Sequence, residues 1–312
     1  MDSISTREAY GNALAEYGID ERIVVLDADL SKSTKTELFK KKYPERFFNM
    51  GIAEANMMSV AAGFASCGKI VFASTFAMFA SGRAFEQVRN SICYPRLNVK
   101  IGASHAGITV GEDGASHQTI EDIAIMSAIP NMVVINPADG IETKSAVKAI
   151  IDYDGPVYLR LSRPNSPIIF NENNYDFALG KGITVTDGKD VTIVSTGPML
   201  SIALEASNIL KNEGISARVI NIHTLKPIDK DLLIKCALET RAILTVEEHS
   251  IIGGLGSIVS SVLSKYHPTP LRMVGIEDEF GKSGKPDELL KMYGLTTENI
   301  IVKIKEIINF KK

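Results

Sequence analysis

Short apolar runs rich in β-branched residues alternate with amphipathic stretches, and this alternation restricts the fold more than any other feature of the sequence. The first expected strands lie at residues 23–27, 69–74, 98–104, 131–137 and 156–162. Helical spacing of apolar residues is found at 55–67, 77–92, 119–128 and 139–152. Strands that alternate with crossover helices are typical of a parallel α/β sheet. We therefore expect a doubly wound domain over residues 1–165.

The alternation stops and then restarts, which predicts a second domain. Residues 166–188 are expected to form a linker, because the sequence up to residue 182 is rich in Asn, Pro and Gly and lacks an apolar stripe. Further strands are expected at 191–196, 217–222, 242–248 and 271–276, with helices at 199–212, 229–239, 254–265 and 297–310. They predict a smaller α/β domain over residues 189–312. A chain of 312 residues is long enough to bury two cores.

Charge and cysteine content narrow the class of function. The net charge of −3 provides no basic field for nucleic acid or anionic lipid, so a small-molecule substrate is favoured. No run of 18 apolar residues and no signal-peptide pattern is present, and we expect a soluble, cytoplasmic protein. Cys67, Cys93 and Cys236 form no CxxC motif and are interpreted as reduced core residues.

The most specific local motif is the segment 51–58, GIAEANMM, which places Glu54 at the start of an expected helix. A glutamate in this position is usually explained by the helix dipole. The segment 74–79, STFAMF, follows about 20 residues later at the end of an expected strand, where open α/β sheets bind ligands. Phe76 and Phe79 could face a flat ring there, although such a pair is more often part of a core.

A second motif, the segment 105–118, HAGITVGEDGASHQ, also follows an expected strand. Its glycines allow the backbone to approach a ligand closely while His and Asp side chains face it. The spacing between His105 and His117 matches no standard metal motif, so a metal site is the less favoured interpretation. The glycines at 253, 254 and 256 predict a tight, closely packed turn rather than a dinucleotide site.

Five segments resemble, in order and spacing, the pyrimidine-binding half of transketolases. They are GIAEANM, STFAMFASGRAFEQVRNS, HAGITVGEDGASHQ, PNMVVINPADGIE and LRLSRP. The remainder of the chain resembles the C-terminal domain of the same family. The resemblance implies a thiamine-diphosphate enzyme that transfers a two-carbon ketol unit from a ketose to an aldose. It also implies a pyrimidine-binding domain followed by a C-terminal domain of the transketolase type.

The resemblance assigns four residues to the cofactor. Glu54 matches the family glutamate that hydrogen-bonds N1′ of the aminopyrimidine ring. Phe76 and Phe79 match the aromatic residues that flank this ring, and Asp29 stands where the family has an acidic residue close to the cofactor.

Other residues are assigned to the substrate. His117 matches a histidine near the reacting carbons, and Asp113 resembles the aspartate that reads the C2 hydroxyl. The residues that resemble the family's group for the terminal phosphate are Arg7, Ser33, His105 and Arg163. Without the resemblance, the two arginines would be read as surface ion pairs and Ser33 as a helix N-cap.

One family motif is not found in this sequence. Transketolases hold magnesium and the diphosphate through GDG followed by Asn some 25 to 30 residues later; here GEDG at 111–114 belongs to the loop described above and TDGKD at 186–190 runs into an expected strand. The resemblance therefore implies the small, C-terminal-half subunit of a split transketolase. We expect a partner that carries GDG and Asn, an α2β2 assembly, and magnesium ligands on the partner. A magnesium site on Glu112 and Asp113 is the competing interpretation.

Three alternatives stay open. Deoxyxylulose-phosphate synthases share GIAE but usually have Arg where His105 stands, and pyruvate-dehydrogenase-type beta subunits lack the HxGxxxGED arrangement. A non-catalytic assembly subunit would not require Glu54, the two aromatic residues and the His/Asp loop together. The sequence does not identify the donor and acceptor sugars, or whether the bound anion is phosphate or sulfonate.

Overall fold

The structure is a computed structural model, and it describes residues 3–311. Its first sheet contains seven strands in the order β12-β6-β7-β5-β4-β2-β3. All neighbours are parallel except β12, which runs antiparallel to β6. The strands are β2 (Ile23–Asp27), β3 (Phe47–Asn49), β4 (Ile70–Phe76), β5 (Val99–Ser104), β6 (Val133–Ile135), β7 (Val157–Arg160) and β12 (Thr224–Lys226).

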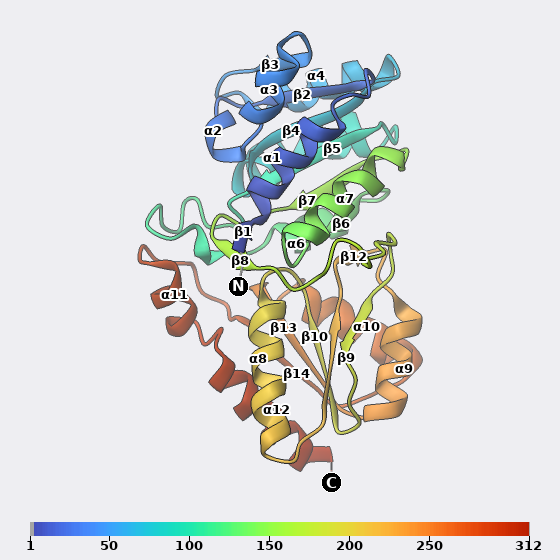
Figure 1. The fold of residues 1–312 in the computed structure, drawn as a ribbon, viewed down its shortest axis with the longest axis vertical. Coiled ribbons are helices and arrows are strands. Elements are labelled where there is room, and N and C mark those ends of the chain that lie inside the picture. The colour runs from blue at the N-terminus through green and yellow to red at the C-terminus, as the bar shows by residue number, and fades with distance from the viewer. Residues whose placement is uncertain (1–2, 312) are drawn as a thin grey trace.

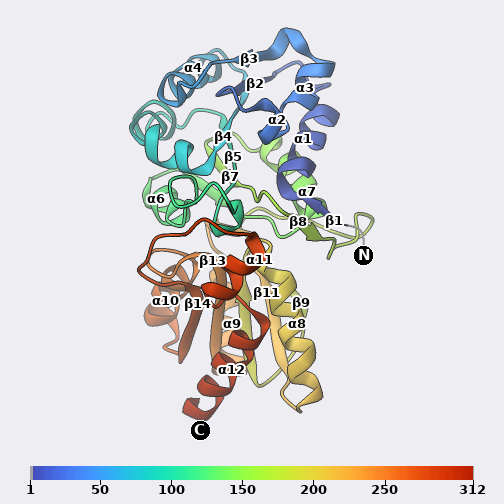
Figure 2. The same ribbon diagram turned by 90° about the vertical axis from the view of Figure 1, so that its left-hand side faces the viewer.

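Helices cover both faces of this sheet, as expected for a doubly wound domain (Figures 1 and 2). Buried side chains of α1 and α7 pack on one face, and those of α4 and α6 pack on the other. The α-helices are α1 (Thr6–Tyr17), α2 (Ser31–Thr34), α3 (Glu37–Lys42), α4 (Glu54–Ser66), α5 (Phe85–Gln87), α6 (Asp122–Ala128) and α7 (Gly140–Asp152). Short 3₁₀ turns, η1 (Pro44–Arg46) and η4 (Ile108–Val110), complete the domain.

The second sheet has the order β14-β13-β10-β11-β9. Its strands are β9 (Ile183–Thr186), β10 (Val191–Ser195), β11 (Ala217–Asn221), β13 (Ile243–Ser250) and β14 (Leu271–Ile276). Its helices are α8 (Met199–Asn212), α9 (Lys230–Thr240), α10 (Leu255–Tyr266), α11 (Pro286–Met292) and α12 (Thr297–Lys311). Figure 1 shows this domain below the first one. The α/β fold class predicted from the alternation of apolar runs is confirmed.

Three details differ from the sequence-based expectation. The predicted linker contains β9, an antiparallel edge strand whose residues are only half buried and therefore show weak apolar patterning. The expected helix at 77–92 is divided into the π-helical turns η2 (Phe79–Arg83) and η3 (Val88–Cys93) on either side of α5. Such π-turns are rare and frequently occur at functional sites. Cys67 is exposed, whereas Cys93 and Cys236 lie in the core as expected.

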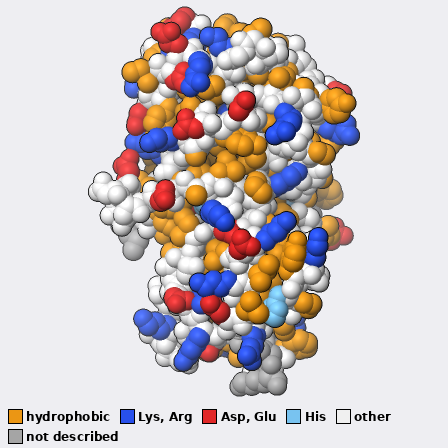
Figure 3. Space-filling view, turned by 90° about the vertical axis from the view of Figure 1, so that its right-hand side faces the viewer, with side chains coloured by type: hydrophobic (Ala, Val, Ile, Leu, Met, Phe, Trp, Pro, Cys, Tyr) orange, Lys and Arg blue, Asp and Glu red, His pale blue; other side chains and the backbone are white. Residues whose placement is uncertain are grey.

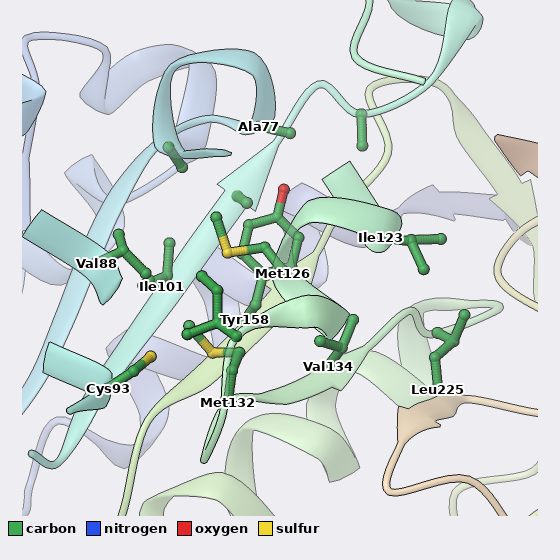
Figure 4. Packing of buried hydrophobic residues seen from close by; sticks show 14 of the residues in the cluster. Ala77, Val88, Cys93, Ile101, Ile123, Met126, Met132, Val134, Tyr158 and Leu225 are labelled. Atoms are coloured by element: carbon green, nitrogen blue, oxygen red, sulfur yellow. The ribbon is translucent and has the colours of Figure 1, made fainter. Parts of the chain in front are cut away.

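The two domains share a continuous core. Leu225 of β12 belongs to the same buried cluster as Met132 and Val134 of the first domain, and Figure 4 shows Val134 between the other two. A short antiparallel pair of β1 (Ser3–Ser5) and β8 (Asn165–Pro167) ties the start of the described chain to the start of the linker. A second domain that adds a strand and apolar side chains to the first is fixed in orientation.

Hydrophobic side chains also reach the surface of both domains, among charged ones (Figure 3). Within residues 3–311, no helix is both long and apolar enough to cross a bilayer. The glycine turn before α10 is tight, as predicted: Gly253 has a φ of +78°, and a Cβ on Gly254 would lie 2.2 Å from Glu247 Oε2.

Candidate active site

Glu54 is the first residue of α4, and only 1% of it is exposed. The turn before it depends on Gly51, which has a φ of +70° that favours glycine. Small and flexible apolar residues of α4, among them Met57 and Ala61, bury this helix against the sheet. A carboxylate so deeply buried requires partners. It receives a hydrogen bond from Arg83 Nη1 at 2.7 Å and a longer one from Thr75 Oγ1 at 3.4 Å.

The aromatic pair lies next to this carboxylate, because Phe76 directly follows Thr75 at the end of β4. The rings of Phe76 and Phe79 are stacked, with centroids 5.9 Å apart and planes 17° apart. Inserting a flat ring between them would require two contacts of about 3.5 Å, or about 7 Å in total. The far side of Phe76 is covered by His105 at 3.9 Å, and the guanidinium of Arg83 lies 4.3 Å from the centroid of Phe79.

His117 joins the same cluster from the loop 105–118. Its ring meets Phe79 edge-on at a centroid distance of 5.3 Å and Phe76 at 6.3 Å. Nδ1 of His117 lies 3.0 Å from Ser116 Oγ, and the side chain is partly exposed. The structure thus brings His117, the two phenylalanines and the Glu54 carboxylate to one edge of the sheet.

A polar group lies on the other side of Phe76. Arg7 Nη1 donates to the carbonyl oxygen of Ser33 at 2.9 Å and lies 3.3 Å from His105 Nε2. Burial, followed by the charges of Arg7 and Arg163, lowers the pKa of His105 to about 3, so its ring is neutral near pH 7. Nε2 can then accept from Arg7 while Nδ1 donates to Ser104 Oγ, 3.0 Å away.

Arg163 completes this group. It donates to the carbonyl oxygen of Val110 and lies 3.7 Å from Glu112 and 3.8 Å from Asp113. Both acids are exposed, so these long ion pairs are weak. Burial, and then the charge of Arg163, lowers the pKa of Arg7. Two cations that disfavour each other form a site where a bound anion would be stabilised.

Two of the predicted site residues behave differently from the expectation. Asp29 is exposed and accepts a hydrogen bond from Asn49 Nδ2 at 2.8 Å. Asn49 in turn accepts from the backbone N–H of Gly51, so this bond ties Asp29 to the GIAE turn and not to the aromatic cluster. Ser33 lies inside α2, whose N-cap is Leu30, so the N-cap interpretation is wrong. Ser33 contributes its backbone carbonyl to Arg7 rather than its hydroxyl.

Arg83 is the residue of this site that the sequence analysis missed. It lies inside the motif STFAMFASGRAFEQVRNS, yet nothing in its spacing shows that it reaches Glu54, 29 residues earlier. The signal that could have found it is the buried glutamate itself, because a buried carboxylate needs a cationic or donor partner.

No group of three or more His, Cys, Asp or Glu side chains able to hold a metal occurs among the described residues. The site is therefore a buried carboxylate beside aromatic faces, next to a cationic group. The carboxylate, the aromatic residues and His105 follow the carboxyl ends of parallel strands, where open α/β sheets bind ligands, and Arg7 reaches His105 from α1.

Comparison with known proteins agrees with this geometry. The family model described as "Transketolase, pyrimidine binding domain" matches residues 2–168, and "Transketolase, C-terminal domain" matches residues 180–300. The chain belongs to the transketolase family. This confirms the resemblance seen in the five sequence motifs. Transketolases are thiamine-diphosphate dependent.

Three relatives place the chain within the family. A protein of Methanocaldococcus jannaschii provisionally named transketolase C-terminal section is 55% identical over 96% of this chain and 95% of its own length. The 6-deoxy-6-sulfo-D-fructose transketolase subunit SqwH of Clostridium sp. (strain MSTE9) is 43% identical, over 96% of this chain and 94% of its own. Rattus norvegicus transketolase is 41% identical, but the match covers 98% of this chain and only 49% of that protein.

Solved structures give the same result. A structure titled "Split gene transketolase, inactive beta4 tetramer" has a TM-score of 0.93 and 55% identity, and the match covers 99% of this chain and 100% of that one. Transketolase of Pichia stipitis in complex with sedoheptulose 7-phosphate has a TM-score of 0.82 and 28% identity, over 99% of this chain and 46% of that one. The chain thus corresponds to about half of the length of undivided transketolases.

Proposed function

We propose that this chain is the C-terminal-half subunit of a split transketolase, which transfers a two-carbon ketol unit from an anionic ketose to an aldose. The observation that carries the proposal is Glu54, a buried carboxylate next to the aromatic faces of Phe76 and Phe79. A scaffold protein would gain nothing from burying a carboxylate whose one close ion-pair partner, Arg83, is half exposed.

The residues fit the pyrimidine end of thiamine diphosphate. Glu54 offers carboxylate oxygens to a ring nitrogen, and Phe79 offers a face for stacking. Because Phe76 and Phe79 lie against each other, we place the pyrimidine on the side of Phe79 that Arg83 covers, not between the two rings. The cofactor supplies the electron sink of the reaction, and the residues of this chain bind, orient and desolvate it.

The cationic group suits an anionic substrate terminus. Arg7, which has the neutral ring of His105 beside it, and Arg163 could share one phosphate or sulfonate. Asp113 and His117 lie in the same loop as His105 and are proposed to contact the sugar. The Clostridium relative is named for a sulfonated ketose, so both anions should be tested.

A separate partner is proposed to hold magnesium and the diphosphate. The described residues contain no metal-binding cluster, and Mg²⁺ needs carboxylate and carbonyl oxygens in addition to phosphates. Apolar side chains that could meet such a partner surround the Glu54 turn: Ile52 is 77% exposed, Phe48 39% and Phe85 36%. We propose an α2β2 complex with sites between the subunits.

Calorimetric titration tests this assignment. We expect the isolated chain to bind thiamine diphosphate and magnesium weakly and to show no ketol transfer. Adding an N-terminal-half subunit that carries the GDG and Asn motif should restore both. A Glu112→Gln/Asp113→Asn variant should bind magnesium as the parent does. Micromolar cofactor binding with turnover in the absence of any partner would overturn the split-enzyme proposal.

A further inference from the structure

The loop 105–118, which carries His105, Asp113 and His117, is hydrogen-bonded to the second domain at several points. All three of its glycines, at 107, 111 and 114, have φ between +75° and +86°. A segment with so many positive φ values has high conformational freedom in isolation. Within the loop, the 3₁₀ turn η4 and short backbone turns over 111–118 give local order, and contacts with other parts of the chain fix the loop in place.

The first anchor is Glu248, on strand β13 of the second domain. Its Oε1 accepts a hydrogen bond from the backbone N–H of Thr109 at 2.8 Å, and only 5% of the residue is exposed. The approach is so close that a Cβ on Gly107 would lie 2.1 Å from the same oxygen. Arg160 of the first domain donates to the carbonyl oxygen of Glu248 at 3.0 Å, so the backbone of β13 is also bonded to the first domain.

The second anchor is the segment 277–285, which connects β14 to α11. Nε2 of Gln118 lies 3.0 Å from the carbonyl oxygens of Ile108 and Gly111 and 2.9 Å from that of Lys282. This amide therefore links both ends of the loop to the second domain. Ser283 Oγ donates to the carbonyl oxygen of Glu112, next to Asp113.

We propose that the second domain is part of the substrate-positioning apparatus, with Glu248 and Ser283 as positioning residues that hold the loop 105–118 against the aromatic cluster. Neither touches the proposed cofactor residues; both act through the backbone that carries Asp113 and His117. The expected effect on kinetics rests on the proposed function, whereas the expected effect on the order of the loop does not.

Adjacent glutamates on β13 provide a matched test. Glu247 is also buried, but it accepts from the backbone N–H groups of Leu255 at 2.6 Å and Gly256 at 2.8 Å, so it stabilises the start of α10 instead of the loop. Amide hydrogen exchange is measured on the full chain carrying Glu248→Ala or Glu247→Ala. We expect Glu248→Ala to speed exchange in 105–118 by about threefold to tenfold. Glu247→Ala should speed exchange only near the start of α10.

Kinetics of the complex with the partner subunit give the second measurement. Glu248→Ala should raise the KM for the ketose and lower kcat, whereas calorimetry should give an unchanged affinity for thiamine diphosphate. Glu248→Gln keeps an acceptor for Thr109 and should recover most of the loss. Ser283→Ala is the second variant, for use if Glu248→Ala does not fold. It is a mild change at an exposed position and should raise KM by about twofold to threefold.

Two results would overturn the proposal. One is loop exchange that stays at the parent rate in both Glu248→Ala and Ser283→Ala. The other is equal acceleration of loop exchange in Glu247→Ala and Glu248→Ala, which would indicate general loosening. If the loop exchanges faster but the parent complex has no ketol-transfer activity, the proposed function fails and the structural anchor stands.

Discussion

Arg83 Nη1 lies 2.7 Å from Glu54 Oε2 while its guanidinium covers the ring of Phe79. A pyrimidine bound as proposed would need the same carboxylate and the same ring face. Arg83 is half exposed, so its long side chain can move into solvent when the cofactor binds. The guanidinium and the pyrimidine therefore compete.

We predict that Arg83→Ala strengthens cofactor binding. Removing the competing ion pair should lower the Kd for thiamine diphosphate in the complex by up to about fivefold, which corresponds to about 1 kcal/mol for a pair whose arginine is half exposed. Calorimetry checks this, with Arg89→Ala as a control that removes an exposed cation from η3. Weaker binding in Arg83→Ala would mean that Arg83 assists Glu54 in the loaded site.

Glu54→Gln should leave the fold intact and remove most turnover. The amide keeps the shape of the side chain and one acceptor, but it cannot exchange a proton with a ring nitrogen. Acid–base groups contribute about 10² to 10⁴-fold, and we expect a loss in that range. Steady-state rates of the complex measure the loss, and a thermal melt checks the fold. Parent turnover in this variant would remove Glu54 from its proposed role.

Arg163→Ala should discriminate between substrates with and without a terminal anion. A charge-assisted contact is worth about 1.5 to 3 kcal/mol, so kcat/KM for a ketose phosphate or sulfonate should fall by about tenfold or more. Values for an unphosphorylated ketose should change little. Arg22→Ala, which breaks an exposed ion pair with Asp20, is the control. An equal loss on both substrate types would refute the anion site.

Glu142 predicts a pH dependence of stability at the domain boundary. It accepts from Asn221 Nδ2 at 2.7 Å and from the Tyr175 hydroxyl, and burial raises its pKa to about 7 from 4.5. Between pH 4.5 and about pH 7, Glu142 is protonated in the folded chain but ionised in the unfolded chain. Its stabilising contribution is fully present below about pH 4.5 and is lost as the pH rises through about 7.

Urea unfolding of the parent and Glu142→Gln checks this expectation. The advantage of the parent over the variant should be larger at pH 5 than at pH 8, since glutamine does not titrate. The comparison cancels the contributions of the buried histidines at 105, 223 and 249, whose pKa values are lowered by burial. An equal difference in urea midpoint between the parent and Glu142→Gln at the two pH values would contradict the assignment.

Most of the architecture could be predicted from the sequence, because apolar periodicity is a local property. The predicted strand 23–27 and helix 199–212 match β2 and α8 residue for residue. The half-buried edge strand β9 and the π-turns around α5 were not predicted, since their form depends on neighbours in space. The same holds for β12, which joins the sheet of the other domain.

For the candidate site, the sequence by itself determined which motifs belong to the transketolase family and that they follow strands of one sheet. Only the tertiary structure decided how their side chains are paired. Arg83 meets Glu54 across 29 residues, and Glu248 reaches Thr109 across 139. Such contacts arise because burying a carboxylate is unfavourable unless a donor is brought to it, and the fold alone selects which donor that is.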